Sequence, residues 1–176
     1  MSASPYIRRI RERIGTELLL IPAVSVMIWD EDGRLLLARG ADTGTWQAIG
    51  GGVDPDESPW DTARRETREE TGLEVELAGI RAVIGGARFR QTYPNGDRVA
   101  FVATVFDAWI AGGALRADGD EIAELAWLDR AELDAGARDA PGSERDESLP
   151  QLLRSILHAA GVTAPNDGVS PPENRG

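Results

Sequence analysis

The feature that most restricts how this chain can fold is an apolar segment near its N-terminus, residues 18–29. Its length and its β-branched residues are typical of a buried β-strand. Asp32-Gly33 is a turn signal, so we expect a second strand over residues 34–39. A further short apolar piece, residues 46–49, precedes three consecutive glycines. The sequence therefore predicts a group of strands in its first third.

The same apolar segment is not typical of a secretion signal or a membrane anchor. Pro22 and Ser25 interrupt it, and Glu12 and Glu17 interrupt the basic region before it. Twelve residues are also too few to cross a bilayer as a helix. The chain contains no cysteine, which is compatible with a reducing compartment. We expect a cytoplasmic protein without a membrane partner.

The best-defined helix follows the three glycines. Ser58 is typical of an N-cap, Asp61 three residues later completes a capping box, and Pro59 occupies the first helical position. Gly72 is typical of the residue that ends a helix. The sequence therefore predicts a helix that begins after Ser58 and ends at Gly72.

Elements of both kinds are expected along the rest of the chain. Strand-rich segments cover residues 73–89, 98–110 and 122–128, and helices are expected at residues 5–15, after Asp129, and at residues 148–160. Asn95-Gly96 is a strong hairpin signal, so the first two segments should pair antiparallel. Hairpins that join several strands favour a mixed α/β sandwich over a doubly wound parallel sheet.

The length of 176 residues favours a single domain. We expect an N-terminal amphipathic helix within residues 1–17, a domain over residues 18–160 and a disordered tail over residues 161–176. The tail prediction rests on three prolines and two glycines among residues 163–176. The basic outer face of the first helix is expected to be a solvated face.

Composition excludes several kinds of chemistry. All 19 basic residues are arginines, and His158 is the single histidine, so lysine chemistry and multi-histidine zinc sites are excluded. The absence of cysteine excludes thiol nucleophiles. A formal charge of -11 argues against nucleic acid or an anionic membrane as the main partner. Carboxylates, arginines, the backbone and a hard metal ion remain.

Three carboxylates share one face of the predicted helix. Glu66, Glu69 and Glu70 stand at spacings of three and four residues. Like charges at these spacings repel each other unless a cation lies against them, and Arg65 can offset only part of that repulsion. One interpretation is a charged, solvated face. The other is a site for Mg²⁺ or Mn²⁺, favoured by the preceding glycines at 50–52, because they let backbone carbonyls approach a ligand closely.

The stretch that contains these residues resembles the Nudix box, G-x5-E-x7-R-E-U-x-E-E-x-G-U, in which U is aliphatic. The matching residues are Gly51, Glu57, Arg65, Glu66, Glu69, Glu70, Gly72 and Leu73. The departure is Thr67, which stands at the first aliphatic position. We expect its methyl to pack in a helix interface and its hydroxyl to bond back to a carbonyl.

The resemblance implies a fold and a set of roles. The fold is an α/β/α sandwich around a mixed β-sheet, in which the Nudix box forms a loop-helix-loop. Glu66, Glu69, Glu70 and the backbone carbonyl of Gly50 would be ligands of Mg²⁺ or Mn²⁺. Glu57 and Arg65 would form a structural salt bridge.

The activity implied is metal-dependent hydrolysis of the diphosphate in a nucleoside diphosphate linked to another moiety. Bound Mg²⁺ would neutralise phosphate charge and activate water, so the acidic composition is no obstacle. The general base is left open between Glu66 and Glu69 on the helix and Glu121 or Glu124 outside it.

Residues outside the box must select the substrate. Arginine binds phosphate and aromatic rings stack on bases, so the candidates are Arg39, Arg88, Arg90, Arg98, Trp46, Phe89 and Tyr93. The favoured substrates are ADP-ribose-like dinucleotides or (d)NTPs. Two alternatives remain, a nucleotide-sensing module without turnover and an interaction domain with an incidental acidic helix. Family members are often dimers, so a homodimer is also an expectation.

Overall fold

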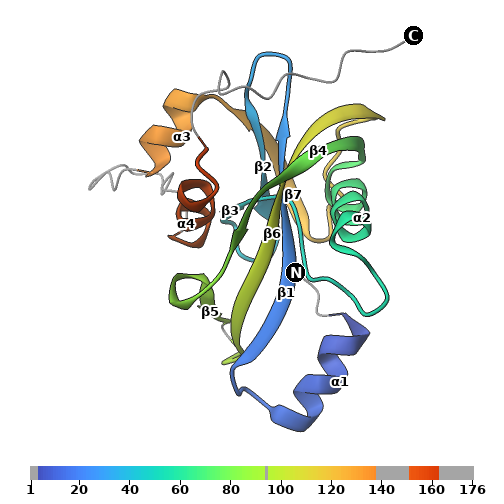
Figure 1. Ribbon diagram of the computed structural model, residues 1–176, viewed down its shortest axis with the longest axis vertical. Helices are drawn as coiled ribbons and strands as arrows, with labels where there is room; N and C mark the ends of the chain where they lie inside the picture. Colours follow the sequence, from blue (N-terminus) through green and yellow to red (C-terminus); the bar gives the residue numbers. More distant parts are fainter. Residues whose placement is uncertain (1–3, 94, 138–150, 163–176) are drawn as a thin grey trace.

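The computed structural model describes residues 4–93, 95–137 and 151–162. Figure 1 shows a twisted sheet with α2 on one side and α3 and α4 on the other, while α1 lies near one end of the sheet. The elements in chain order are α1 (Pro5–Ile14), β1 (Leu19–Trp29), β2 (Leu35–Gly40), β3 (Trp46–Gln47), α2 (Pro59–Thr71), β4 (Leu73–Ile84), the 3-10 helix η1 (Ala87–Phe89), β5 (Arg90–Thr92), β6 (Arg98–Gly113), β7 (Ile122–Leu128), α3 (Arg130–Ala137) and α4 (Gln151–Ala159).

The sheet is mixed. Its main path runs β3-β2-β1-β6-β4, with β5 paired to β6 and β7 paired to β2. β1 and β6 are parallel from Leu19↔Val99 to Trp29↔Trp109, and the other pairings between strands are antiparallel. The expected mixed α/β sandwich is therefore confirmed.

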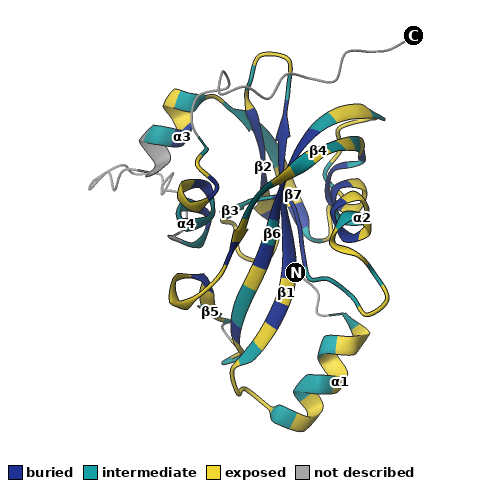
Figure 2. Ribbon diagram, viewed as in Figure 1, coloured by how far each residue is buried: buried dark blue, intermediate teal, exposed yellow. Residues whose placement is uncertain are grey.

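From Ala23 to Trp29, β1 is buried on both faces, which explains the continuous apolar sequence of this part (Figure 2). Met27 and Trp29 belong to a core cluster that also contains Leu153 and Leu157 from α4. Val26 and Ile28 belong to a second cluster that contains Ala63 from α2. Successive side chains of a strand point to opposite faces, so one strand supports both layers of helices.

α2 has the predicted bounds. The Ser58 hydroxyl accepts a hydrogen bond from the Asp61 N–H and the Asp61 carboxylate accepts from the Ser58 N–H, which completes the capping box. Gly72 ends the helix in the left-handed conformation, with a φ of 70°. These two residues therefore fix the segment that carries the carboxylates.

The expectation for Thr67 was wrong in part. Its side chain is fully buried, and its hydroxyl has no hydrogen-bond partner among the described residues. The neighbouring hydroxyl of Thr71 takes the expected role, because it donates to the Thr67 carbonyl at 2.6 Å. The Thr67 methyl and hydroxyl thus stand where the box has an aliphatic side chain.

The strand predicted over residues 73–89 ends earlier. β4 stops at Ile84, and η1 replaces the remainder because Gly86 has a φ of 95°, which a regular strand does not tolerate. β4 does pair antiparallel with β6. The Asn95-Gly96 turn, however, connects the short strand β5 to β6.

The C-terminal predictions fall partly outside the described residues. The helix expected from Ser148 is described as α4, Gln151–Ala159, and the tail at 163–176 lies outside the described ranges. Asp129 and Glu132 exchange hydrogen bonds at the start of α3, as their spacing predicts. No helix in the described part of the chain is both long and apolar enough to cross a membrane.

Candidate active site

The glycine loop is fixed on the edge of β1. The Val24 N–H donates to the Gly51 carbonyl at 2.9 Å, and the Val26 N–H donates to the Ile49 carbonyl at 2.8 Å. This edge is available because β2 pairs with β1 only at Trp29↔Leu35. The loop therefore lies between the central strand and α2.

Two glycines of this loop leave room for neighbouring groups, and at Gly50 the neighbour is fixed backbone whereas at Gly51 it is the movable end of a side chain. A Cβ on Gly50, whose φ is 140°, would collide with the Val24 carbonyl. A Cβ on Gly51 would displace the carboxyl group of Glu66 from its present position. The absence of side chains here lets the backbone approach both β1 and the α2 carboxylates.

Arg65 and Glu57 form a bidentate ion pair between the loop and α2. Arg65 Nε donates to Glu57 Oε1 at 2.7 Å and Nη2 donates to Oε2 at 2.9 Å. The Thr62 hydroxyl donates to the same carboxylate at 2.8 Å. The hydrogen bonds from Arg65 lower the pKa of Glu57 to about 2. The pair therefore stays charged across the physiological range and ties the loop to the helix.

The same guanidinium also contacts two of the three carboxylates predicted as metal ligands. Arg65 Nη1 lies 2.8 Å from Glu66 Oε1 and 3.1 Å from Glu69 Oε2. The Glu69 side chain is 59% exposed, whereas that of Glu66 is only 15% exposed. Arg65 thus offsets part of the repulsion along this helix face, as the sequence suggested.

Glu70 is the buried member of the group. Its carboxylate accepts a hydrogen bond from the Gly50 N–H at 3.1 Å, and the residue is 4% exposed. Burial raises the pKa of Glu70 to about 8 despite this hydrogen bond, and the negative charges of Glu66, Glu121 and Asp118 raise the pKa further. Four carboxyl groups from α2 and the loop before β7 therefore converge.

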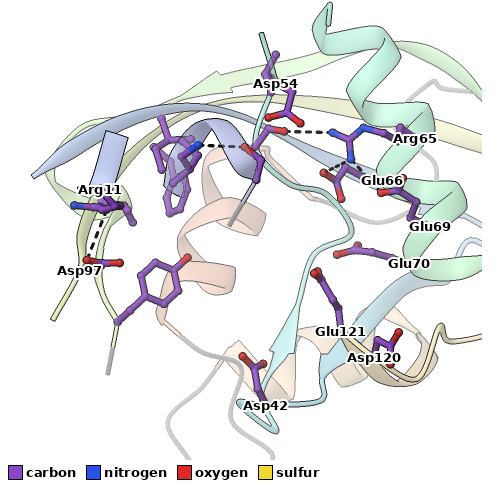
Figure 3. Close-up of a pocket in the computed structure, with 18 of the residues that line it drawn as sticks. Arg11, Asp42, Asp54, Arg65, Glu66, Glu69, Glu70, Asp97, Asp120 and Glu121 are labelled. Atoms are coloured by element: carbon purple, nitrogen blue, oxygen red, sulfur yellow. Dashed lines mark hydrogen bonds and ion pairs between the residues drawn. The ribbon is translucent and has the colours of Figure 1, made fainter. Parts of the chain in front are cut away.

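Asp118 positions Glu121. Its carboxylate accepts hydrogen bonds from the N–H groups of Asp120, Glu121 and Ile122 at 2.9–3.0 Å. This turn places Glu121 beside the α2 carboxylates; Figure 3 shows Glu121 and Glu70 pointing toward one another. Glu124, the other candidate base outside the helix, instead pairs with Arg39 at 3.4 Å.

These groups line one end of a pocket of about 730 Å³ (Figure 3). Its described lining contains nine acidic residues and two arginines, Arg11 and Arg65. The acidic residues are Asp42, Asp54, Glu66, Glu69, Glu70, Asp97, Asp118, Asp120 and Glu121. Ser4, Ile7 and Tyr93 are among the other lining residues.

Of the residues predicted to bind substrate, only Tyr93 is among the described residues that line this pocket. Arg39 donates to the Gly44 carbonyl at 2.7 Å, and its guanidinium lies 5.9 Å from the centre of the Trp46 ring. Arg88 belongs to η1 and Arg90 to β5, and both are exposed. A role for Arg39, Trp46, Arg88 and Arg90 in binding substrate stays a prediction.

Sequence reasoning missed several lining residues, chiefly Arg11, Ile7 and Asp118. The Asp118-Gly119-Asp120 stretch is a turn signal that could have indicated Asp118. No local pattern indicates Arg11 or Ile7, because they reach the pocket only through the way α1 folds against the strands. Tyr93, a predicted stacking residue, does line the pocket.

The donor chemistry fits a hard divalent cation. In the described parts of the chain, no three His, Asp or Glu side chains already stand in a metal-binding arrangement. The carboxylates instead accept hydrogen bonds from protein groups: Arg65 donates to Glu66 and Glu69, and the Gly50 N–H donates to Glu70. Oxygen ligands alone, with mutually repelling carboxylates, are the set that Mg²⁺ or Mn²⁺ prefers.

Comparison with known proteins gives one consistent result. A family model for the NUDIX domain matches residues 19–152. A MutT-like protein from Streptomyces ambofaciens is 35% identical over 123 residues, which cover 70% of this chain and 72% of that protein. A putative 8-oxo-dGTP diphosphatase from Bacillus subtilis (strain 168) is 33% identical over 103 residues, or 58% of this chain and 62% of that protein.

The solved structures agree with this result. The MutT protein of Methanosarcina mazei Go1 matches with a TM-score of 0.61 and 26% identity, over 83% of this chain and 96% of that one. The domain match includes the glycine loop, α2 and the loop that carries Glu121. The chain therefore belongs to the Nudix hydrolase family.

Proposed function

We propose that this protein is a divalent-metal-dependent pyrophosphohydrolase. It cleaves the diphosphate linkage of a nucleoside diphosphate joined to another moiety, with ADP-ribose-like compounds or (d)NTPs as substrates. The observation that carries the proposal is the convergence of Glu66, Glu70, Glu121 and Asp118, where burial and the charges of the other three carboxylates raise the pKa of Glu70. Repulsion between these carboxylates costs free energy unless a cation is bound among them. With a cation bound, the same groups suit hydrolysis of a phosphate ester or anhydride.

The metal is Mg²⁺ or Mn²⁺ in this proposal, held by Glu66, Glu69, Glu70 and the Gly50 carbonyl. When bound, it would supply the positive charge that a diphosphate needs in so acidic a pocket and lower the pKa of an attacking water. The Gly50 carbonyl suits this role because none of the described residues donates a hydrogen bond to it, whereas the Gly51 carbonyl is taken by Val24.

The proton of the attacking water passes to a carboxylate of the same cluster. Glu66, Glu69 and Glu121 are the candidates, and Glu121 is favoured among them by its surroundings. It is set by the Asp118 turn on a separate loop, and it faces the α2 carboxylates without belonging to their helix. A base held on its own loop can approach a water from a different direction than the ligands do.

The name of one relative supports a nucleotide as the substrate. The Bacillus subtilis protein named a putative 8-oxo-dGTP diphosphatase shares 33% identity over the 103 matched residues. This chain spans only 62% of that protein, so its substrate is one member of the panel to be tested.

The test is a substrate screen with purified protein in Mg²⁺ or Mn²⁺, with products identified by mass. We expect release of a nucleoside monophosphate from at least one compound in a panel of ADP-ribose, nucleotide sugars, (d)NTPs and 8-oxo-dGTP. Glu69→Gln and Glu70→Gln should each lower kcat by a factor on the order of 100 or more.

Glu76→Gln is the matched control, because Glu76 is an exposed carboxylate of β4 away from the pocket. Its kcat should equal that of the unmodified protein. No product from any compound, or near-normal turnover in both the Glu69 and the Glu70 variants, would refute the proposal.

A further inference from the structure

Helix α1 lies outside residues 19–152, the part of the chain that matches the NUDIX domain, yet it helps to form the pocket. Ser4, Ile7 and Arg11 all line the pocket. Ile7 and Arg11 are four residues apart and lie on one face of α1, and Ser4 is the N-cap of this helix. α1 is therefore a pocket wall that the family domain alone does not supply.

Arg11 holds this wall in place. Its Nη1 donates to the carbonyls of Gly15 at 3.1 Å and Glu17 at 2.7 Å, and its Nη2 donates to the Arg98 carbonyl at 2.8 Å. Arg11 Nε lies 3.7 Å from Asp97 Oδ1. Because the side chain is only 12% exposed and its donors face protein groups, Arg11 joins α1 to the β5–β6 turn.

The charges of the pocket restrict what can lie against α1. Arg11 and Arg65 are the two arginines of the described lining, and both are paired with carboxylates. Arg11 and Asp97 lie at the end of the pocket away from Glu66 and Glu70 (Figure 3). A phosphate group bound at that end would lie near the negative charge of Asp97. Both described arginines of the lining already pair with carboxylates, so we expect the group bound there to be uncharged or cationic.

The same end of the pocket is rich in apolar surface. Ile21 and Phe101 are direct neighbours on the parallel strands β1 and β6, and Val99 lies two residues before Phe101. Tyr93 adds a half-buried ring, and burial together with the charge of Asp42 raises the pKa of its hydroxyl, so the ring stays neutral. Aromatic and branched side chains of this kind suit a flat, uncharged ring.

We propose that the α1 wall binds the nucleoside of the substrate, with Ile7 contacting the base and thereby determining specificity. Arg11 is a positioning residue, which acts by holding α1 against the β5–β6 turn. This inference rests on the proposed function, because it places the diphosphate at the carboxylate end of the same pocket. The nucleoside is thus selected by a helix outside the matched domain.

Four variants distinguish loss of the proposed contact between Ile7 and the base from a general loosening of α1. Ile7→Ala removes the proposed contact. Ile10→Ala removes a similarly half-buried side chain of α1 that does not line the pocket. Arg11→Ala removes the hydrogen bonds and the ion pair that attach α1 to the β5–β6 turn. Arg9→Ala removes an exposed arginine of the same helix. Circular dichroism and thermal unfolding establish that each variant is folded at the assay temperature.

The first measurement is steady-state kinetics on ADP-ribose and dGTP with Mg²⁺. Ile7→Ala and Arg11→Ala should each raise KM about tenfold for the better substrate, with kcat within about twofold, because the lost contact is equal in ground and transition states. The double variant should show no further increase, since Arg11 acts through α1. Ile10→Ala and Arg9→Ala should keep the original KM.

The second measurement is equilibrium binding of AMP and dGMP, which needs no turnover. The Kd of the better ligand should rise about tenfold in Ile7→Ala and stay unchanged in Ile10→Ala. If ADP-ribose or dGTP is hydrolysed but Ile7→Ala leaves KM and Kd unchanged, the inference is wrong and the proposed function stands. If neither compound is hydrolysed, the binding measurement decides. A Kd that rises in Ile7→Ala supports binding of the nucleoside by α1, whereas an unchanged Kd, or no binding of AMP and dGMP, overturns the inference.

Discussion

The hydroxyl of Thr67 is one of two buried side-chain polar atoms without a hydrogen-bond partner in the described part of the chain, and the other is Nε1 of Trp109. Thr67 is fully buried on α2, at a position where the Nudix box has an aliphatic side chain. A buried hydroxyl without a partner costs free energy, and valine has nearly the same shape. Thr67→Val should therefore raise the free energy of unfolding by about 1 kcal/mol in a urea titration.

Thr71, one helical turn after Thr67, has a buried hydroxyl that is fully hydrogen-bonded. The Thr71 hydroxyl donates to the Thr67 carbonyl at 2.6 Å and accepts from the Leu73 N–H at 3.1 Å. Thr71→Val should lower the free energy of unfolding by about 1–2 kcal/mol, because it leaves both backbone groups without that partner. Equal effects of the same sign in the two variants would show that the hydrogen bonds do not decide stability here.

The burial of Glu70 among other carboxylates leads to a prediction of how a bound metal ion changes thermal stability. Its carboxyl group is buried close to Glu66 and Glu121, so a cation bound there relieves repulsion that exists only in the folded state. A ligand that binds only the folded state stabilises it by about 2.7 kcal/mol at a hundred times its Kd. Mn²⁺ should raise Tm by several degrees, and Glu70→Gln should reduce that shift; equal shifts in both proteins would contradict the ligand assignment.

At the scale of elements, the Glu57–Arg65 pair makes the attachment of the loop to α2 dependent on pH. The pKa of Glu57 is lowered to about 2 in the folded protein from an ordinary value of 4.5. Its stabilisation is therefore complete above about pH 4.5 and is lost as the pH falls through 2. At pH 7 Glu57→Gln should lower the free energy of unfolding by about 2 kcal/mol, an amount reduced for the partial exposure of the pair.

The check is a series of urea titrations between pH 3 and pH 7. The difference between Glu57→Gln and the unmodified protein should shrink steadily as the pH approaches 3. A difference that is constant with pH would mean that the amide substitution disturbs packing and that the ion pair contributes little.

Local signals predicted the elements they define. Ser58, Asp61 and Gly72 set the ends of α2, because caps act through backbone groups only a few residues away. The common face of Glu66, Glu69 and Glu70 follows from helix geometry in the same way. The end of β4 was missed because the strand pattern continues beyond Ile84, and the conformation of Gly86 interrupts it.

At the scale of the whole molecule, the site depends on contacts between segments far apart in the sequence. Glu121 meets Glu70, and Arg11 reaches the carbonyl of Arg98, across separations that no sequence spacing encodes. The same limit applies to Arg39 and Trp46, which were expected to contact substrate on residue type alone. The sheet brings those two together with Glu124 and not with the pocket. Residue types and helix spacing thus predicted the cluster of carboxylates better than they predicted the other residues that line the pocket.

The long-range contact that joins α4 to the sheet yields a final prediction. Asp107 on β6 is 6% exposed; it accepts from Trp29 Nε1 at 3.0 Å and from Arg81 Nε at 2.7 Å. Arg81 also donates to the carbonyls of Ala160 and Gly161, just beyond the end of α4. One arginine therefore connects three strands to the last described helix.

Asp107→Asn leaves Arg81 without its charged partner, so it should lower the free energy of unfolding by about 3 kcal/mol. Hydrogen exchange should become faster in α4 first, because Arg81, no longer held by a charged Asp107, is a less fixed donor to the carbonyls of Ala160 and Gly161 just beyond this helix. Asp134→Asn is the control, since the Arg130–Asp134 pair is more exposed and should contribute less than about 1 kcal/mol. KM should stay unchanged in both, because none of these residues lines the pocket. Equal losses of stability would mean that burial of Asp107 does not set the strength of this connection.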